Sequence, residues 1–139
     1  MVGEENKALV RLFTEEFWDK GNLAAADELM TANATIVLPG MGQVNREGFK
    51  AFAASFQSAF PDWHTTTDEL IAEGDQVASR WTGRGTHQGE FQGMAPTGRA
   101  VTLPGTVFYR LVAGKITEFR GQFDGLALIQ QLGAIPDQG

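Results

Sequence analysis

The fold of this chain is decided by two stretches of alternating sequence, Ala100-Val-Thr-Leu-Pro-Gly-Thr-Val-Phe-Tyr-Arg-Leu-Val112 and Lys115-Ile-Thr-Glu-Phe-Arg-Gly-Gln-Phe123. Apolar and polar residues alternate along both, which is the two-residue period of a β-strand. The short link Ala113-Gly114 between them predicts an antiparallel hairpin. Segments 63–72 and 76–85 repeat this arrangement earlier in the chain. We therefore expect two consecutive long hairpins in the second half of the sequence.

The start of the chain has the spacing of a helix instead. Leu9, Phe13 and Phe17 recur every four residues, which predicts an amphipathic helix over 6–20. Gly21 follows directly and is expected to end this helix, because glycine readily takes the left-handed conformation of a helix C-terminus.

Two further helices are expected before the hairpins. Asn22 is placed to cap a short helix over 22–30, and Asn45 to cap a third helix that ends before Pro61. Between them, the β-branched run Ala34–Leu38 predicts one short strand. Helices followed by antiparallel strands are typical of an α+β domain, in which helices cover one face of a bent sheet.

Composition excludes several kinds of site and partner. The 139 residues predict a single domain, and the absence of cysteine excludes thiol nucleophiles and cysteine metal sites and favours the cytoplasm. The net charge of -6, with scattered cations, argues against nucleic acid as a partner. No apolar run approaches the ~20 residues of a membrane helix, and the acidic start predicts no signal peptide. The two histidines, His64 and His87, lack the spacing of metal ligands, so no metal site is expected.

The end of the last strand is the first candidate for chemistry. Strand alternation places Arg120, Gln122 and Asp124 on one face and Phe119 and Phe123 on the other. If the polar face lies inside, Asp124 is the acid/base, and Arg120 holds a substrate oxyanion. Two other interpretations stay open. The polar row faces solvent, or Asp124 caps a final helix.

The chain also holds many large aromatic side chains for its size, at Phe13, Phe17, Trp18, Phe49, Phe52, Phe56, Phe60, Trp63, Trp81 and Tyr109. Core packing is the usual role of such residues, but helices over a strongly curved sheet also leave a cavity that some of them can line. The residues that we assign to a ligand-binding wall are Phe13, Phe17, Trp18, Leu38, Phe56, Trp63, Trp81, His87 and Tyr109. For His87, a position at the cavity mouth and a solvated loop position both stay open.

Several short motifs follow one another in a recognisable order. They are Asn6-Lys-Ala-Leu-Val10, Gly21-Asn-Leu23, Phe60-Pro-Asp62, Ile71-Ala-Glu-Gly-Asp75, Arg80-Trp-Thr82, Gly85-Thr-His-Gln-Gly-Glu-Phe91, Pro96-Thr-Gly98, Gly114-Lys-Ile116, Phe123-Asp124 and Leu128-Ile-Gln-Gln-Leu-Gly-Ala-Ile-Pro136. Their order and spacing resemble the SnoaL-like polyketide cyclases, or ester cyclases, of the nuclear-transport-factor-two-like superfamily.

The resemblance implies a fold and an activity. The implied fold is a cone-shaped α+β barrel, in which a curved, mostly antiparallel sheet and three N-terminal helices enclose an apolar pocket, assembled as a homodimer or homotetramer. The implied activity is an intramolecular aldol condensation in which a pocket aspartate is the acid/base and no metal or cofactor takes part. Asp124 occupies the matching position. The chain departs from the family at Leu38, where a histidine is common, and at Phe119 and Arg120, where a His-Trp pair is common.

Three functions follow as hypotheses. In the first, Asp124 removes a proton next to a carbonyl of an apolar aromatic or polyketide-like substrate, while Arg120 and Gln122 stabilise the enolate. The second is an epoxide hydrolase or ketosteroid isomerase of the same superfamily. The hydrolase would require a second carboxylate such as Asp68 or Glu69, and the isomerase would use the one tyrosine as its hydrogen-bond donor. The third is a non-catalytic protein that binds small apolar ligands, in which Asp124 is exposed or occupied in capping.

Overall fold

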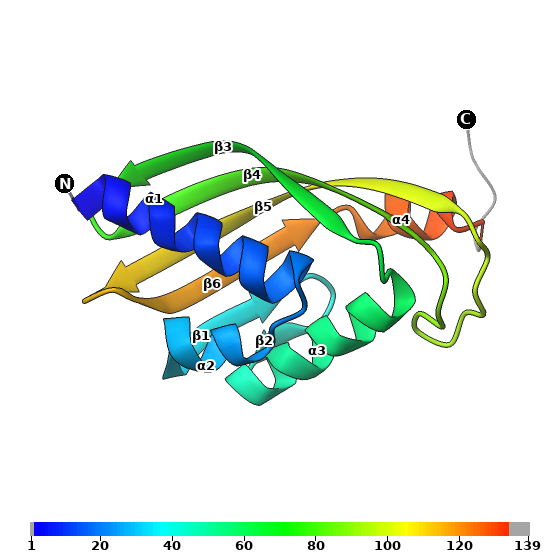
Figure 1. The fold of residues 1–139 in the computed structure, drawn as a ribbon, viewed down its shortest axis with the longest axis horizontal. Helices are drawn as coiled ribbons and strands as arrows, with labels where there is room; N and C mark the ends of the chain where they lie inside the picture. The colour runs from blue at the N-terminus through cyan, green and yellow to red at the C-terminus, as the bar shows by residue number, and fades with distance from the viewer. Residues whose placement is uncertain (1, 134–139) are drawn as a thin grey trace.

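The computed structural model describes residues 2–133, in which helices cover the concave side of one curved sheet (Figure 1). The helices are α1 (Val2–Phe13), its π-helical continuation η1 (Thr14–Asp19), α2 (Ala24–Leu29), α3 (Arg46–Ala59) and α4 (Gly125–Gln131). The strands are β1 (Met30–Leu38), β2 (Gly42–Val44), β3 (His64–Glu73), β4 (Gln76–Thr86), β5 (Ala100–Val112) and β6 (Lys115–Phe123). Residues 134–136 of the last motif lie outside the described residues.

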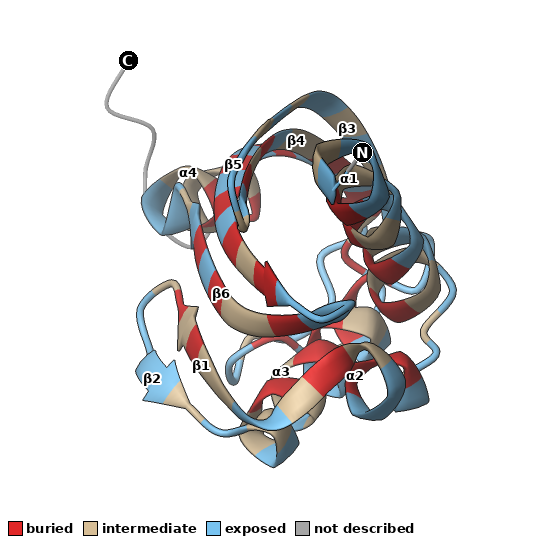
Figure 2. Cartoon of the chain, turned by 90° about the vertical axis from the view of Figure 1, so that its left-hand side faces the viewer, coloured by how far each residue is buried: buried red, intermediate tan, exposed pale blue. Residues whose placement is uncertain are grey.

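The strands form one sheet in the order β2-β1-β6-β5-β4-β3. All neighbours are antiparallel except β1 and β6, which are parallel. The sheet curves strongly without closing, α1 and α3 stand inside the curve, and α4 lies at the end of β5 (Figure 2). The predicted α+β architecture and both long hairpins are confirmed.

The first strand differs most from the prediction. It begins at Met30 instead of Ala34, and its pairing with β6 shifts register between Met30 and Thr35. This irregular start explains why the stretch lacks the alternation of a regular strand. The short partner β2 was not predicted. It forms because the chain reverses after Leu38 and pairs this residue with Gly42.

The helix signals are confirmed at two positions and wrong at one. Gly21 has φ +75°, as expected of a helix stop, and the Asn45 side chain accepts a 2.7 Å hydrogen bond from the backbone N–H of Gly48. Asn22, however, does not cap α2 through its side chain. The N-cap is Leu23, because Asn22 belongs to the end of the wide π-helical turn η1. There the backbone N–H of Asn22 donates a hydrogen bond to the carbonyl of Glu16.

A cluster of stacked phenylalanines joins the helices to the sheet. Phe17 of η1 lies 4.7 Å from Phe49 of α3 between ring centroids, and Phe49 lies 4.8 Å from Phe119 of β6. Phe13 stacks on Phe17 at 4.9 Å, and all four rings are buried. Phe13 and Phe17 therefore belong to the core, which corrects their assignment to a ligand-binding wall.

Replacing Phe49, the central ring of this cluster, tests how much the cluster contributes to the stability of the fold. Phe49→Ala is expected to lower the free energy of unfolding by about 3–5 kcal/mol, because it removes a fully buried ring with four aromatic neighbours. Urea unfolding followed by circular dichroism measures the change. The matched control is Phe108→Ala, since Phe108 is 60% exposed on the outer face of β5, and we expect a loss below about 0.5 kcal/mol. Similar losses for both variants would contradict this account.

Candidate ligand-binding site

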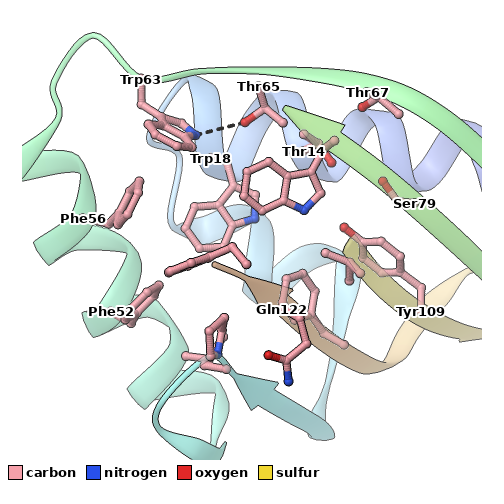
Figure 3. A pocket seen from close by; sticks show the side chains of 17 residues that line it. Thr14, Trp18, Phe52, Phe56, Trp63, Thr65, Thr67, Ser79, Tyr109 and Gln122 are labelled. Atoms are coloured by element: carbon pink, nitrogen blue, oxygen red, sulfur yellow. Dashed lines mark hydrogen bonds between the residues drawn. The ribbon is translucent and has the colours of Figure 1, made fainter. Parts of the chain in front are cut away.

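A cavity opens between the inner face of the sheet and the helices η1 and α3 (Figure 3). Its empty volume is about 620 Å³, part of which is open to solvent. Sites for small molecules are commonly concave and lined mostly by apolar and aromatic side chains, as this cavity is, so it is the candidate place for a ligand.

One side of the cavity is aromatic. Its rings come from η1, α3, the segment before β3, and the strands β4 and β6, and they are Trp18, Phe52, Phe56, Trp63, Trp81, Phe119 and Phe123. The Phe56 ring meets the Trp63 ring edge to face, with centroids 4.7 Å apart. The indole N–H of Trp63 is satisfied, because it donates a 3.0 Å hydrogen bond to the Thr65 hydroxyl.

Hydroxyl groups gather on another side of the cavity (Figure 3). They belong to Thr14, Thr65, Thr67, Ser79 and Tyr109. Burial raises the pKa of the Tyr109 phenol, and the neighbouring Thr14 hydroxyl offsets only part of this effect. Thr14 itself donates to the carbonyl of Val10 at 3.0 Å, so its oxygen remains an acceptor. Tyr109 is therefore a neutral phenol, and its one hydrogen can go either to the Thr14 oxygen or to an oxygen atom of a ligand.

No charged side chain lines the cavity in the part of the chain that the structure describes. The remaining lining residues are Leu38, Pro39, Val107, Gly121 and Gln122. A charged ligand would lose its hydration here without gaining an opposite charge, which is unfavourable. The lining therefore favours a neutral ligand that is mostly apolar and carries oxygen atoms on one side.

The polar row of β6 lies mainly outside this cavity, which corrects the expectation that it faces inward. Phe119, Gly121 and Phe123 take the inner face, because burying two aromatic rings is favourable and burying a guanidinium is not. Arg120 is exposed, with its Nε 3.6 Å from a Glu118 carboxylate oxygen. Gln122 borders the cavity but stays exposed.

Asp124 has a structural contact of its own. Its Oδ1 accepts a 2.9 Å hydrogen bond from the N–H of Ala127, so it is the N-cap of α4. The residue is exposed and does not line the cavity. The capping interpretation of Asp124 agrees with this geometry.

The structure places six of the nine residues of the predicted wall in the cavity lining. Trp18, Leu38, Phe56, Trp63, Trp81 and Tyr109 line the cavity. His87 does not, and it is not a solvated loop residue either. It is fully buried beside Phe60, with ring centroids 5.5 Å apart, and its Nδ1 accepts a 3.2 Å hydrogen bond from the N–H of Thr97.

Sequence reasoning missed ten lining residues, among them Thr14, Phe52 and Ser79. Ser79 lies two residues from both Val77 and Trp81 and so shares their face of β4. Strand alternation could therefore have placed it on the inner face. Phe52 could have been found from the apolar spacing of α3. Nothing in the sequence singles out Thr14.

The carboxylates considered for a hydrolase also lie elsewhere. Asp68 accepts a 2.6 Å hydrogen bond from the Thr82 hydroxyl, and Glu69 lies 3.3 Å from Nε of Arg80. Neither lines the cavity, so the structure does not assemble an Asp–Arg–Asp site there. Tyr109 lines the cavity, whereas Asp124 lies outside it. An isomerase would need both groups at one substrate, so this geometry argues against the isomerase as well.

Two other features can be stated for residues 2–133. His, Asp and Glu side chains do not form a group of three or more that could hold a metal ion. No helix in this range is long and apolar enough to cross a membrane.

Solved structures share this fold across most of the chain. AclR, a candidate hydroxylase from Streptomyces galilaeus, is 29% identical with a TM-score of 0.88, covering 99% of this chain and 86% of AclR. A candidate SnoaL-like polyketide cyclase from Jannaschia sp. CCS1 is 26% identical with a TM-score of 0.88, covering 97% of this chain and 96% of its own. IdmH, a candidate polyketide cyclase from Streptomyces antibioticus, is 31% identical with a TM-score of 0.81, covering 92% and 98%.

Sequence comparison gives the same result at the level of the family. No curated protein matches the chain. The sequence model of the SnoaL-like polyketide cyclases matches residues 8–132, which is all but the two ends. The protein therefore belongs to the SnoaL-like polyketide cyclase family.

Proposed function

We propose that this protein binds a neutral, mostly apolar aromatic or polyketide-like carbonyl compound and promotes its ring closure by an aldol-type reaction. The observation that carries the proposal is the uncharged cavity, with aromatic rings on one side and hydroxyl groups on another. Membership of a cyclase family supports the reaction type. The uncharged lining supports the ligand class.

The proposed reaction uses positioning and hydrogen bonds. A carbon next to one carbonyl loses a proton to water at the open mouth of the cavity and attacks a second carbonyl carbon, and the oxygen of that carbonyl takes a proton back from water to become the new hydroxyl group. Tyr109 donates a hydrogen bond to the oxygen on which negative charge develops, and the aromatic side holds the chain folded and excludes water. The substrate's own conjugated carbonyls delocalise the carbanion. This scheme needs no carboxylate inside the cavity.

A binding protein without turnover is the second candidate. The capping contact of Asp124 favours it, because the residue that the family resemblance implies as acid/base is engaged in holding α4. Turnover of an aryl diketone separates the two candidates. We use ethyl 3,7-dioxo-7-phenylheptanoate, whose C2 lies between two carbonyl groups and which closes to ethyl 6-oxo-2-phenylcyclohex-1-ene-1-carboxylate with loss of water. The cyclase predicts faster formation of the enone absorbance than in buffer, and the binding protein predicts no acceleration.

Ligand charge tests the proposed class directly. All three tryptophans line the cavity, so their fluorescence reports its occupation. We expect 2-acetonaphthone, a neutral ketone, to quench this fluorescence with at least tenfold higher affinity than 2-naphthoate, because the carboxylate would be buried without a counter-charge. Equal or tighter binding of 2-naphthoate would contradict a site for neutral ligands.

The role of Tyr109 is tested by removing one oxygen atom. Tyr109→Phe is expected to weaken binding of 2-acetonaphthone about tenfold, which corresponds to one lost hydrogen bond of about 1–1.5 kcal/mol. Binding of 2-ethylnaphthalene, which lacks the carbonyl, should stay within about twofold, since it makes no such bond. A parallel loss for both ligands would mean that the substitution disturbs packing instead.

Asp124 is tested with two substitutions that separate capping from catalysis. Asn caps helices about as well as Asp, whereas Asp124→Ala is expected to cost about 1 kcal/mol of unfolding free energy. We expect Asp124→Asn to keep stability, ketone affinity and any diketone closure. Urea unfolding and the two ligand assays measure these quantities. Loss of closure in Asp124→Asn at unchanged stability would restore Asp124 as the acid/base.

A further inference from the structure

Two tryptophans of the cavity lie directly over glycines of a neighbouring strand. In β4, Gly83 pairs with Thr65 of β3, and a Cβ built on Gly83 would stand 2.0 Å from Cζ2 of Trp63. In β5, Gly105 pairs with Trp81 of β4, and its Cβ would stand 2.1 Å from Cζ2 of that indole. No real side chain fits in such a space. Each indole therefore occupies the place of a missing side chain.

The backbone does not require glycine at either position. Both residues lie inside regular strands, and neither has a positive φ. Glycine in a strand interior weakens the strand, because it has no side chain to pack and loses more conformational freedom on folding. The space taken by the indoles is thus the feature of the structure that explains these two glycines.

Trp63 is held on its other sides as well. Its N–H donates to the Thr65 hydroxyl at 3.0 Å, and the Thr65 backbone N–H donates to Asp19 of η1 at 3.0 Å. The Phe56 ring contacts the indole edge to face. Trp63 also lines the cavity, so we expect a side chain at position 83 to push the indole toward the cavity and away from these contacts.

We propose that Gly83 is a specificity-determining residue, which sets the size of the ring system that the cavity admits by letting Trp63 recede against β4. This inference rests on the proposed function and narrows it to ligands with two fused rings instead of one. Gly83 is the better position to test, because the three atoms nearest to its built Cβ all belong to Trp63. At Gly105 the backbone carbonyl of Gln122 also stands 2.8 Å away.

The test compares a one-ring and a two-ring ketone. Isothermal titration calorimetry gives the affinities of wild type and Gly83→Ala for acetophenone and for 2-acetonaphthone. We expect Gly83→Ala to lose at least tenfold affinity for 2-acetonaphthone and to stay within about twofold for acetophenone, because the displaced indole occupies the space of the second ring. The double variant Gly83→Ala/Trp63→Phe should recover the affinity for 2-acetonaphthone, since a smaller ring accommodates the methyl group.

The control variant is Gly3→Ala in α1, where a built Cβ makes only an ordinary 3.6 Å contact with Ala72. Both of its affinities should equal those of wild type. Equal losses for the two ketones in Gly83→Ala, no loss for either, or failure of the double variant to recover affinity would each overturn the role of Gly83.

Failure of the proposed function has a different result. If wild type binds neither ketone, the ligand class is wrong, and the position of Trp63 is then read without ligand from the indole N–H resonances of ¹⁵N-labelled protein. A shifted Trp63 resonance with an unshifted Trp18 resonance in Gly83→Ala supports the proposal, and an unchanged spectrum overturns it. If Gly83→Ala does not fold, folding of the double variant supports the clash, and its failure to fold contradicts it.

Discussion

The stack of Phe17, Phe49 and Phe119 is the contact on which the rest of the structure depends. It fixes η1 and α3 against β6, at centroid distances of 4.7 and 4.8 Å, so the helices cannot sink further toward the sheet. Rigid rings in mutual contact resist compression, because protein interiors are packed as densely as organic crystals. A second buried cluster around Phe56, Phe60 and Leu103 supports the other end of α3. The cavity lies between these two supports and stays open because neither can yield.

The volume of the cavity then depends on how large and small side chains are distributed. Large rings come from the helices and from the strands, whereas Ser79, Gly83 and Gly105 are small residues of β4 and β5. A strand position without a side chain lets an indole from the next strand lie against the backbone. The curvature of the sheet adds to the same effect, since it moves the inner face away from the helices (Figure 2). The apolar space is therefore built from small residues on a bent sheet as much as from the aromatic rings that border it.

The sequence allowed the fold to be predicted far better than the site. Two-residue alternation predicts β5 and β6 at their observed bounds, because one face of each strand is buried and the other is exposed to solvent. The same alternation groups Arg120 with Gln122 but cannot tell which face is inside. The presence of Phe119 and Phe123 in the opposite row was the available signal, and the burial of aromatic rings outweighs that of a guanidinium. His87 was misplaced for a different reason, since its burial comes from loop contacts with Thr97 and Phe60 that no periodicity describes.

The uncharged lining limits what chemistry the proposed cyclase can accelerate. All the acidic side chains that give the chain its net charge of -6 lie outside the described cavity lining. Without a carboxylate or imidazole in contact with the ligand, the usual gain of about 10²–10⁴ from a positioned acid or base is lost. A hydrogen-bond donor such as Tyr109 contributes about 10²–10³ in comparable sites, and orientation of two reacting groups contributes further. These contributions suffice only for a substrate whose carbon acid is already activated by its own carbonyls. The same scaffold occurs in a candidate hydroxylase and in candidate cyclases, so the fold alone does not choose the reaction. In the proposed reaction, the substrate determines which chemistry takes place, and the protein contributes the shape of the cavity, its apolar surface and one neutral phenol.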